Sequence, residues 1–435
     1  MTIFFPHIIL FLARFLRGIW EHHLSCEYNA PFILIISIIG FNFILERILS
    51  LLNARNYDAS LPPEVKDVYE PSQYRKSQIY KKVNERFSII TSSFSFILIN
   101  VILILHIFGY FDQIARSFTS NPIWVALIFF SIIMLASDLL NTPFALYDTF
   151  VIEEKFGFNK TSLATFFLDK LKGWLLAGVL GGGITALIIW FYLVTKENFW
   201  IYAWLAVSGV MIFLNMFYST LIVPLFNKQT PLEEGPLRNA IRDFCNKVNF
   251  KLENVFVIDG SKRSTKSNAY FTGLGSKKRI VLFDTLIDDL SQEEIVAVLA
   301  HEIGHYKKKH SRLNILLGVL QTGITLYIFS LFTVNPMLSW ALGAKVHSIH
   351  MVILAFGIIY SPISTVVGLA LNFLSRAHEY QADRYAKLHY SAEHLISALK
   401  KLASKSLSNL TPHPLYVFFH YSHPTLMQRI KALRK

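Results

Sequence analysis

Long apolar runs restrict this chain more than any other feature of its sequence. The chain is 53% hydrophobic and only 16% charged, whereas an ordinary soluble domain is about 25% charged. A helix needs roughly 20 apolar residues to cross a bilayer. We therefore predict an all-α polytopic membrane protein with seven transmembrane helices, at approximately 31–52, 87–110, 122–145, 173–195, 200–226, 313–334 and 349–374.

An eighth apolar stretch, from Ile3 to Trp20, is interrupted by Arg14 and Arg17. Charges within so short an apolar run are typical of an amphipathic helix that lies in the membrane interface. No basic segment precedes the run, so a cleaved signal peptide is not expected.

Basic residues in the connections between spans predict the orientation. Eleven Lys and Arg lie in 53–86 and 146–172, against three in 111–121, 196–199 and 335–348. The positive-inside rule places the basic side in the cytosol. The formal net charge of +13 then reflects loops that lie against anionic lipid headgroups, and nucleic-acid binding is not expected.

The polar segments complete the predicted organisation. The segment after the fifth span reads as a small cytosolic α+β insert, with one helix at 236–250 and short strands at 254–259, 268–273 and 279–284. We expect five parts: an N-terminal interfacial segment (1–30), five spans (31–226), the cytosolic catalytic insert (227–311), spans six and seven (312–374) and a cytosolic tail (375–435).

One motif in the insert carries chemistry. In "LSQEEIVAVLAHEIGHYKKKH", Ser291 and Glu294 form a capping-box pair that starts a helix. His301 and His305 lie one turn apart on that helix, so both imidazoles can reach one metal ion, and Glu302 can reach a water bound to it. Two histidines and a carboxylate predict one Zn²⁺ with an open position, where a bound water has its pKa lowered to about 7.

A catalytic zinc needs a third protein ligand. Two predicted spans follow the motif, so the chain returns to the cytosolic face with "RAHEYQADRYA". There Glu379 and Asp383 share a helix face, and one could bind zinc while the other orients a histidine. An ordinary charged helix face is the alternative. The candidates are His310, His378, Glu379, Asp383, Glu393 and His423.

Among these we discount His310. Its offset of five residues from His305 turns it about 140° away on a continuous helix.

The spans also contain Asp138, Asn141 and Asn215, which either face a polar lumen or form hydrogen bonds between helices.

Several motifs together resemble one family. They are "HEIGH", "EYQAD", "FVIEEKFGFNKTS", "LIVPLFNKQTPLEEGPLR", "SKRSTKSNAYFTG" and "SHPTLMQRI". Their order, from about residue 30 to the C-terminus, resembles the type 1 CAAX prenyl endopeptidases, which are integral-membrane zinc metalloproteases. The resemblance implies an α-helical membrane barrel around a water-filled chamber, with zinc at its cytosolic end.

The resemblance also implies roles for particular residues. His301, His305 and Glu379 match the family's zinc ligands, Glu302 its catalytic glutamate, and Asp383 the carboxylate that supports the metal site. His423 and Arg429 match positions near the metal, where a donor could stabilise the oxyanion; a surface tail motif is the alternative.

A strand edge is the expected substrate-binding element, since a peptide substrate can pair with such an edge as an added strand. A plain strand is the alternative. The predicted residues on this edge are Asn268, Ala269, Tyr270 and Phe271, and Arg429, near the metal, is a further predicted substrate-binding residue.

The predicted function is a membrane-embedded zinc endopeptidase that cleaves prenylated or membrane-associated proteins near their C-terminus. A broad-specificity quality-control metalloprotease is one alternative. A zinc or peptide transporter is another, although transport has no need of Glu302. The chain lacks a long insertion between spans six and seven and a clear lysine-based retrieval signal. Both a bacterial cytoplasmic membrane and the endoplasmic reticulum membrane are therefore candidate locations.

Overall fold

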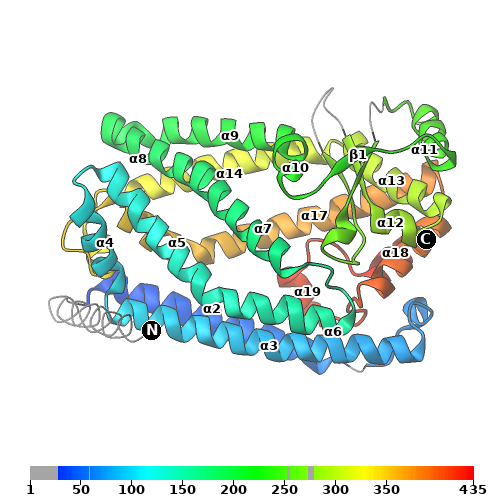
Figure 1. Ribbon diagram of the computed structural model, residues 1–435, viewed down its shortest axis with the longest axis horizontal. Helices are drawn as coiled ribbons and strands as arrows, with labels where there is room; N and C mark the ends of the chain where they lie inside the picture. The colour runs from blue at the N-terminus through cyan, green and yellow to red at the C-terminus, as the bar shows by residue number, and fades with distance from the viewer. Residues whose placement is uncertain (1–27, 58, 252–254, 273–278) are drawn as a thin grey trace.

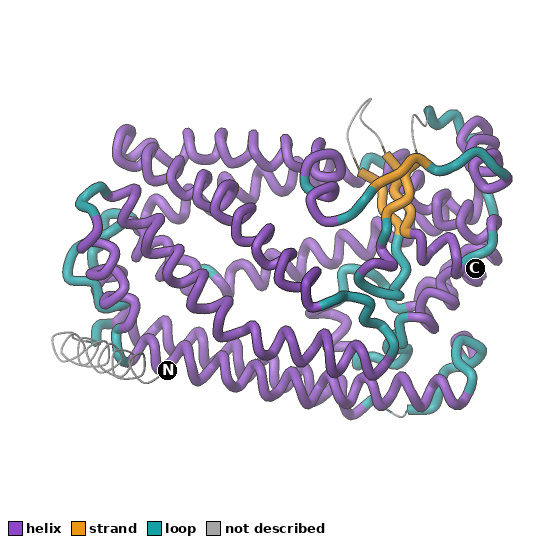
Figure 2. Tube along the Cα trace, viewed as in Figure 1, coloured by secondary structure: helices purple, strands orange, loops and turns teal. Residues whose placement is uncertain are grey.

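The computed structural model describes residues 28–435 except 58, 252–254 and 273–278. The predicted interfacial helix from Ile3 to Trp20 lies outside these described residues. Helices make up most of the molecule, and a small sheet lies toward one end of the long helical bundle (Figure 2).

Five helical segments are long and apolar enough to cross a membrane. A sixth counts if α16 (Ile349–Ile359) and α17 (Ser361–His389), which meet at a bend of 53°, form one broken span. Three of the five are single helices: α2 (Ala30–Arg55), α3 (Pro71–Ile104) and α14 (His310–Phe332). The other two are the continuous runs Pro122–Phe156 and Leu163–Phe226. The first run consists of α5 (Pro122–Tyr147), a π-helix (Asp148–Glu153) and α6 (Glu154–Phe156).

The 64-residue run Leu163–Phe226 contains two of the seven predicted stretches. The helices on either side of Lys196 pack against each other, so the run reverses direction there (Figure 1). The φ of Lys196 is +48°. The elements of the run are α7 (Leu163–Leu176), a π-helix (Ala177–Gly182), α8 (Gly183–Thr195), a 3₁₀ turn (Lys196–Asn198), α9 (Phe199–Leu221) and α10 (Val223–Phe226).

The first predicted connection, 53–86, is largely helical. α3 begins at Pro71, well before the apolar stretch, because proline favours the first helical turn and no breaker follows. The polar half of α3 therefore projects beyond the apolar zone. There Tyr80 donates a hydrogen bond to Glu153, which also accepts one from Lys266 at 2.7 Å.

The polar residues of the spans have local partners. Asp138 of α5 pairs with Lys170 of α7 at 2.7 Å. Asn141 donates to the carbonyl of Ser137 in its own helix. Asp138 thus bonds between helices through Oδ1, while its Oδ2 is buried without a hydrogen-bond partner within the described residues, and Asn141 bonds within its own helix.

The sheet has four strands in the order β1-β2-β4-β3. The three predicted strands are present as β2 (Val255–Ile258), β3 (Ala269–Thr272) and β4 (Arg279–Phe283). β2 and β4 are parallel, while β3 pairs antiparallel with β4 and β1 (Gln229–Pro231) antiparallel with β2. We did not predict β1, which is three residues long and ends in proline. β3 forms one edge of the sheet.

Helix α13 (Gln292–Lys307) is the centre of the polar end. The predicted capping box is confirmed, because the Ser291 and Glu294 side chains each bond the other's backbone N–H. α13 packs against α17 and α18 (Ala392–Lys405). A Cβ on Gly304 would lie 3.0 Å from the Cβ of Tyr385 and 3.1 Å from the Cα of Ala382, so a glycine lets α13 and α17 approach closely.

Two large hydrophobic cores stabilise the molecule. One joins the sheet, α13 and the C-terminal helices with residues that precede α3, and the other lies at the far end of the bundle around α4 and α16. The remaining helices are α4 (Ile107–Phe118), α11 (Pro236–Lys247), α12 (Asp284–Asp289), α15 (Met337–Ala341), α19 (Pro414–His420) and α20 (Leu426–Arg434), with 3₁₀ turns at Pro63–Val65 and Gly260–Lys262.

Candidate metal centre

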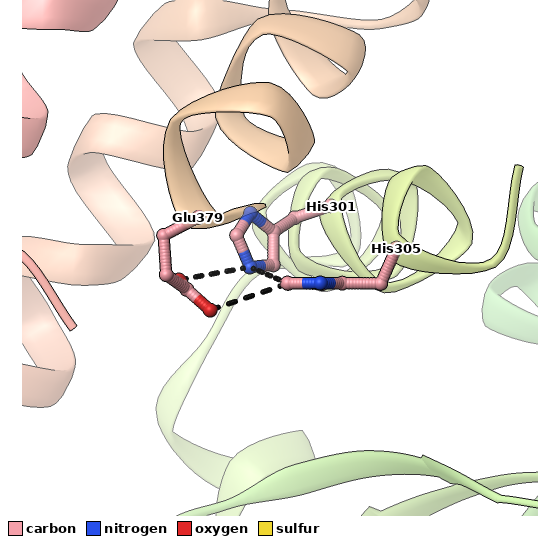
Figure 3. A group of neighbouring side chains, drawn as sticks. All are labelled: His301, His305 and Glu379. Carbon is pink, nitrogen blue, oxygen red and sulfur yellow. Dashed lines mark hydrogen bonds and ion pairs between the residues drawn. The ribbon is translucent and has the colours of Figure 1, made fainter. Parts of the chain in front are cut away.

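Three side chains meet where α13 packs against α17 (Figure 3). The Nε2 atoms of His301 and His305 are 3.1 Å apart. Glu379 places Oε2 at 3.4 Å from the first nitrogen and Oε1 at 3.3 Å from the second. The helical spacing of the two histidines and the return of the chain through α14 and α16 bring these groups together.

The geometry of this triangle fits one metal ion. Zinc bonds to His nitrogen and carboxylate oxygen are about 2.0–2.2 Å long, and tetrahedral angles then put ligand atoms roughly 3.3–3.6 Å apart. The observed separations are at or just below that range. Glu379 Oε2 is also buried and accepts no hydrogen bond within the described residues, an arrangement that a bound cation would satisfy.

Carboxylates favour positive charge at His301. Its Nδ1 lies 2.9 Å from Asp383 Oδ1, and both side chains are buried. Burial opposes protonation of the imidazole, but the nearby carboxylates of Asp383 and Glu379 outweigh it and raise the pKa of His301 to about 9. The same two carboxylates would stabilise a cation bound at Nε2 of His301.

Glu302 lies next to His301 on α13 and is partly buried. Its carboxylate makes no hydrogen bond or ion pair to any residue that the structure describes. A carboxylate without a hydrogen-bond partner among the described residues, beside a candidate metal site, can accept a proton from a water molecule there.

His423 and Arg429 both come from the C-terminal tail but differ in environment. His423 Nε2 lies 3.2 Å from Glu379 Oε1, with 61% of the side chain exposed. Arg429 is only 11% exposed and donates to both oxygens of Asp383. The Thr425 capping box fixes the start of α20 and so the position of Arg429. His423 is therefore accessible to a ligand, while Arg429 holds Asp383 and also lies 3.3 Å from His301 Nδ1 and 3.5 Å from Glu379 Oε2.

The predicted substrate-binding residues lie on the edge strand. Ala269, Tyr270 and Phe271 pair with β4 on one side only, and β3 also contacts α13. Asn268 precedes the strand, is exposed, and accepts a backbone hydrogen bond from Phe283. The free edge of β3 thus lies near the helix that carries the two histidines.

Two residues beside the site differ from our expectation. His310 does not point away, since its Nδ1 lies 3.0 Å from Nδ1 of His305. Gln381, which we did not single out, contacts the other nitrogen of His310 at 3.1 Å. The helical extrapolation failed because α13 ends at Lys307 and Lys309 adopts a left-handed conformation. The run of three lysines before the apolar stretch was the one available signal for such a break.

Membrane helices joined to a His-His-Glu cluster define a membrane metallopeptidase, and the comparisons agree. Residues 50–228 match the family described as "CAAX prenyl protease N-terminal, five membrane helices", and residues 231–435 match "Peptidase family M48". The chain belongs to the CAAX prenyl protease 1 family within peptidase family M48, and it is a membrane metalloendopeptidase. The resemblance found in the sequence is confirmed.

Individual relatives cover almost the whole chain. CAAX prenyl protease 1 of Saccharomyces cerevisiae is 35% identical over 93% of this chain and 96% of its own length. The CAAX prenyl protease 1 homolog of Homo sapiens is 31% identical over 90% and 93%. The crystal structure of S. mikatae Ste24p superposes with a TM-score of 0.89, at 32% identity, over 94% of this chain and 100% of that one.

Proposed function

We propose that this chain is a zinc endopeptidase that cleaves prenylated CAAX proteins after the modified cysteine and releases their last three residues. The observation that carries the proposal is the triangle of His301, His305 and Glu379 beside the free edge of β3. The names of the relatives support the substrate class. The His₂Glu donor set, which catalytic zinc sites use, supports the metal.

The proposed roles follow from position. His301, His305 and Glu379 would hold the zinc ion, which when bound acts as a Lewis acid toward the scissile carbonyl. Glu302 accepts a proton from the attacking water and delivers it to the leaving nitrogen. Asp383 orients His301 by accepting from Nδ1.

The remaining site residues would bind the substrate. A peptide adds to the edge of β3 and so pairs with the backbone of Asn268, Ala269, Tyr270 and Phe271. His423, which is accessible, donates to the oxyanion, and Arg429 supports this side of the site through Asp383. A cavity of ≈ 360 Å³ lined in part by Ser267, His423 and Arg429 adjoins the site, and it could receive the residues that follow the cut.

We propose that the chain crosses the membrane seven times around a chamber. The reversal at Lys196 within the run Leu163–Phe226 supports counting that run as two crossings, and the bent pair α16–α17 adds another. Only 6–17% of each apolar window of the five spans is buried, so most of their apolar surface is left to face lipid or the proposed chamber. The five-part division with boundaries at 30, 226, 311 and 374 accompanies this topology.

The site would face the cytosol, since the connections on its side carry eleven of the fourteen basic residues counted between spans. The relatives compared come from a yeast and a human. This source favours the endoplasmic reticulum membrane over a bacterial cytoplasmic membrane.

The two alternative functions receive less support. A broad-specificity quality-control protease shares the metal site, but family membership favours CAAX processing. A zinc or peptide transporter would not require Glu302 beside the metal site.

The test uses the purified full-length chain, zinc-loaded in detergent, with a farnesylated peptide and its unfarnesylated copy. Mass spectrometry of the products should show one cut after the farnesylated cysteine. Glu302→Gln should retain zinc and lose about 10²–10⁴-fold in turnover. Glu293→Gln, an exposed glutamate on the same helix, is the matched control. Equal cleavage of both peptides would overturn the substrate proposal, and full turnover by Glu302→Gln would overturn the mechanism.

A further inference from the structure

A chain of hydrogen bonds leads away from the metal-facing side of His305, through the buried His310 to the exposed Gln381. Its Nδ1 lies 3.0 Å from Nδ1 of His310. The opposite nitrogen of His310, Nε2, lies 3.1 Å from Oε1 of Gln381. The His378 ring stacks on His310 with centroids 3.9 Å apart and an interplanar angle of 9°. Stacking and burial fix the His310 ring in place.

The backbone explains why these groups meet. α13 carries His305 in its last turn and ends at Lys307. Lys309 has φ +61° and ψ +24°, a left-handed conformation that breaks the helix, and α14 begins with His310. The imidazole of this first residue thus returns to the last turn of α13. Gln381 lies two residues after Glu379 on α17.

The directions of the hydrogen bonds follow from the metal. To bind a cation through Nε2, a neutral His305 must carry its proton on Nδ1. Among the residues that the structure describes, the partner of that N–H is His310 Nδ1, which must then accept. A neutral His310 that accepts on Nδ1 carries its proton on Nε2. This second N–H donates to Gln381 Oε1, the acceptor atom of the amide.

We propose that His310 and Gln381 are positioning residues that hold His305 in the tautomer needed for metal binding. The proposal rests on the proposed function, in which His305 is a zinc ligand. His310 itself is not a ligand, because its contact is with the nitrogen of His305 that faces away from Glu379. The two ligand histidines are therefore held differently: His301 by the charged Asp383 and His305 by a neutral imidazole and amide.

The relay, which is the chain of hydrogen bonds from His305 through His310 to Gln381, runs in one donor-to-acceptor direction that substitutions can preserve or oppose. Gln381→Glu keeps an acceptor opposite His310 Nε2, so zinc affinity should stay within about threefold of wild type. Gln381→Lys offers only donors, and His310→Leu removes the relay. Each should weaken zinc binding about 10–100-fold, the usual range for partners of ligand histidines. His389→Ala is the matched control, because the hydrogen bond and the ring stacking of this imidazole on α17 are both with Tyr385 of its own turn.

Zinc affinity is measured by chelator competition with the purified full-length chain at fixed pH, and the visible spectrum of the cobalt-substituted protein reports ligand geometry. His310→Asn should restore part of the affinity lost in His310→Leu, since its carbonyl oxygen can accept from His305. The Gln381→Lys effect should vanish in the His310→Leu background if it acts through the relay. A nearby positive charge that acts directly on the metal would instead weaken binding additively.

Wild-type zinc affinity in His310→Leu, or additive losses in the double variant, would overturn the relay. Failure of the proposed function gives a different result. In that case the wild-type chain would not bind zinc stoichiometrically, or His305→Ala would bind it as tightly as wild type.

Discussion

Replacing Asp383 by Asn tests the electrostatic design of the metal centre. The Asp383 carboxylate accepts from His301 Nδ1 at 2.9 Å and from Nε and Nη2 of Arg429. An asparagine has nearly the same shape but only one acceptor oxygen. If its NH₂ faces Arg429, two donors oppose each other. If it faces His301, the imidazole must accept on Nδ1 and carry its proton on Nε2, where the metal would bind.

Two magnitudes follow from these contacts. Removing one partner of a buried ion pair typically costs about 3–5 kcal/mol of stability, and Arg429 is 11% exposed. Its remaining contact with Glu379, at 3.5 Å, places the expected cost at the lower end, about 3 kcal/mol. Loss of the partner of a ligand histidine weakens metal binding about 10–100-fold, which is about 1.4–2.7 kcal/mol.

Chelator competition gives the zinc affinity and thermal unfolding in detergent gives the stability of the Asp383→Asn protein. The double variant Asp383→Asn/Arg429→Leu separates the two effects. Removing the unpaired guanidinium should recover much of the stability, while zinc affinity stays low because His301 still lacks its carboxylate. Wild-type zinc affinity in Asp383→Asn would refute the orienting role of Asp383.

Two further predictions concern helix α13. Gly304→Ala gains about 1 kcal/mol of helix propensity, but it overpacks the contact with Tyr385 and Ala382, which costs about 1–3 kcal/mol. Thermal unfolding should therefore show a net loss of stability, and chelator competition should show weaker zinc binding. Gly178→Ala, in open space, should leave zinc affinity unchanged and should not lower stability. Glu294 is buried, but hydrogen bonds from Lys401 and Ser397 lower its pKa. At pH 7 the wild-type protein should therefore be about 1–3 kcal/mol more stable to unfolding than Glu294→Gln. This difference should disappear as the pH falls below 4.5, where the carboxylate becomes protonated. A pH-independent difference between the two proteins would contradict this.

Much of the fold could be predicted from run lengths and spacing. The apolar runs gave the ends of α2, α5 and α14 to within three residues, and the capping box gave the start of α13. The count of spans could not be predicted in the same way, because hydropathy measures the length of an apolar stretch and not its direction. The reversal at Lys196 depends on backbone dihedral angles at one polar residue, which composition does not specify.

For the candidate site too, the sequence predicts some features and not others. The pair His301 and His305 follows from helical spacing, since both lie on one continuous helix. Glu379 and Asp383 stood as a pair of alternatives on one helix face until family resemblance separated their roles. The structure shows a distinction that spacing alone could not give. Glu379 lies toward both Nε2 atoms, while Asp383 lies at Nδ1 of His301 and pairs with Arg429.

His310 shows most clearly where sequence reasoning ends. A helical projection assumes that the helix continues, and on that assumption five residues carry His310 away from His305. One left-handed residue, Lys309, ends the projection and brings the imidazole back within 3.0 Å. The same residue joins the metal-site helix to the membrane helix α14. The bond between His305 and His310 therefore links the last turn of α13 to the first residue of α14, so a change in the direction of α14 would act directly on a proposed metal ligand.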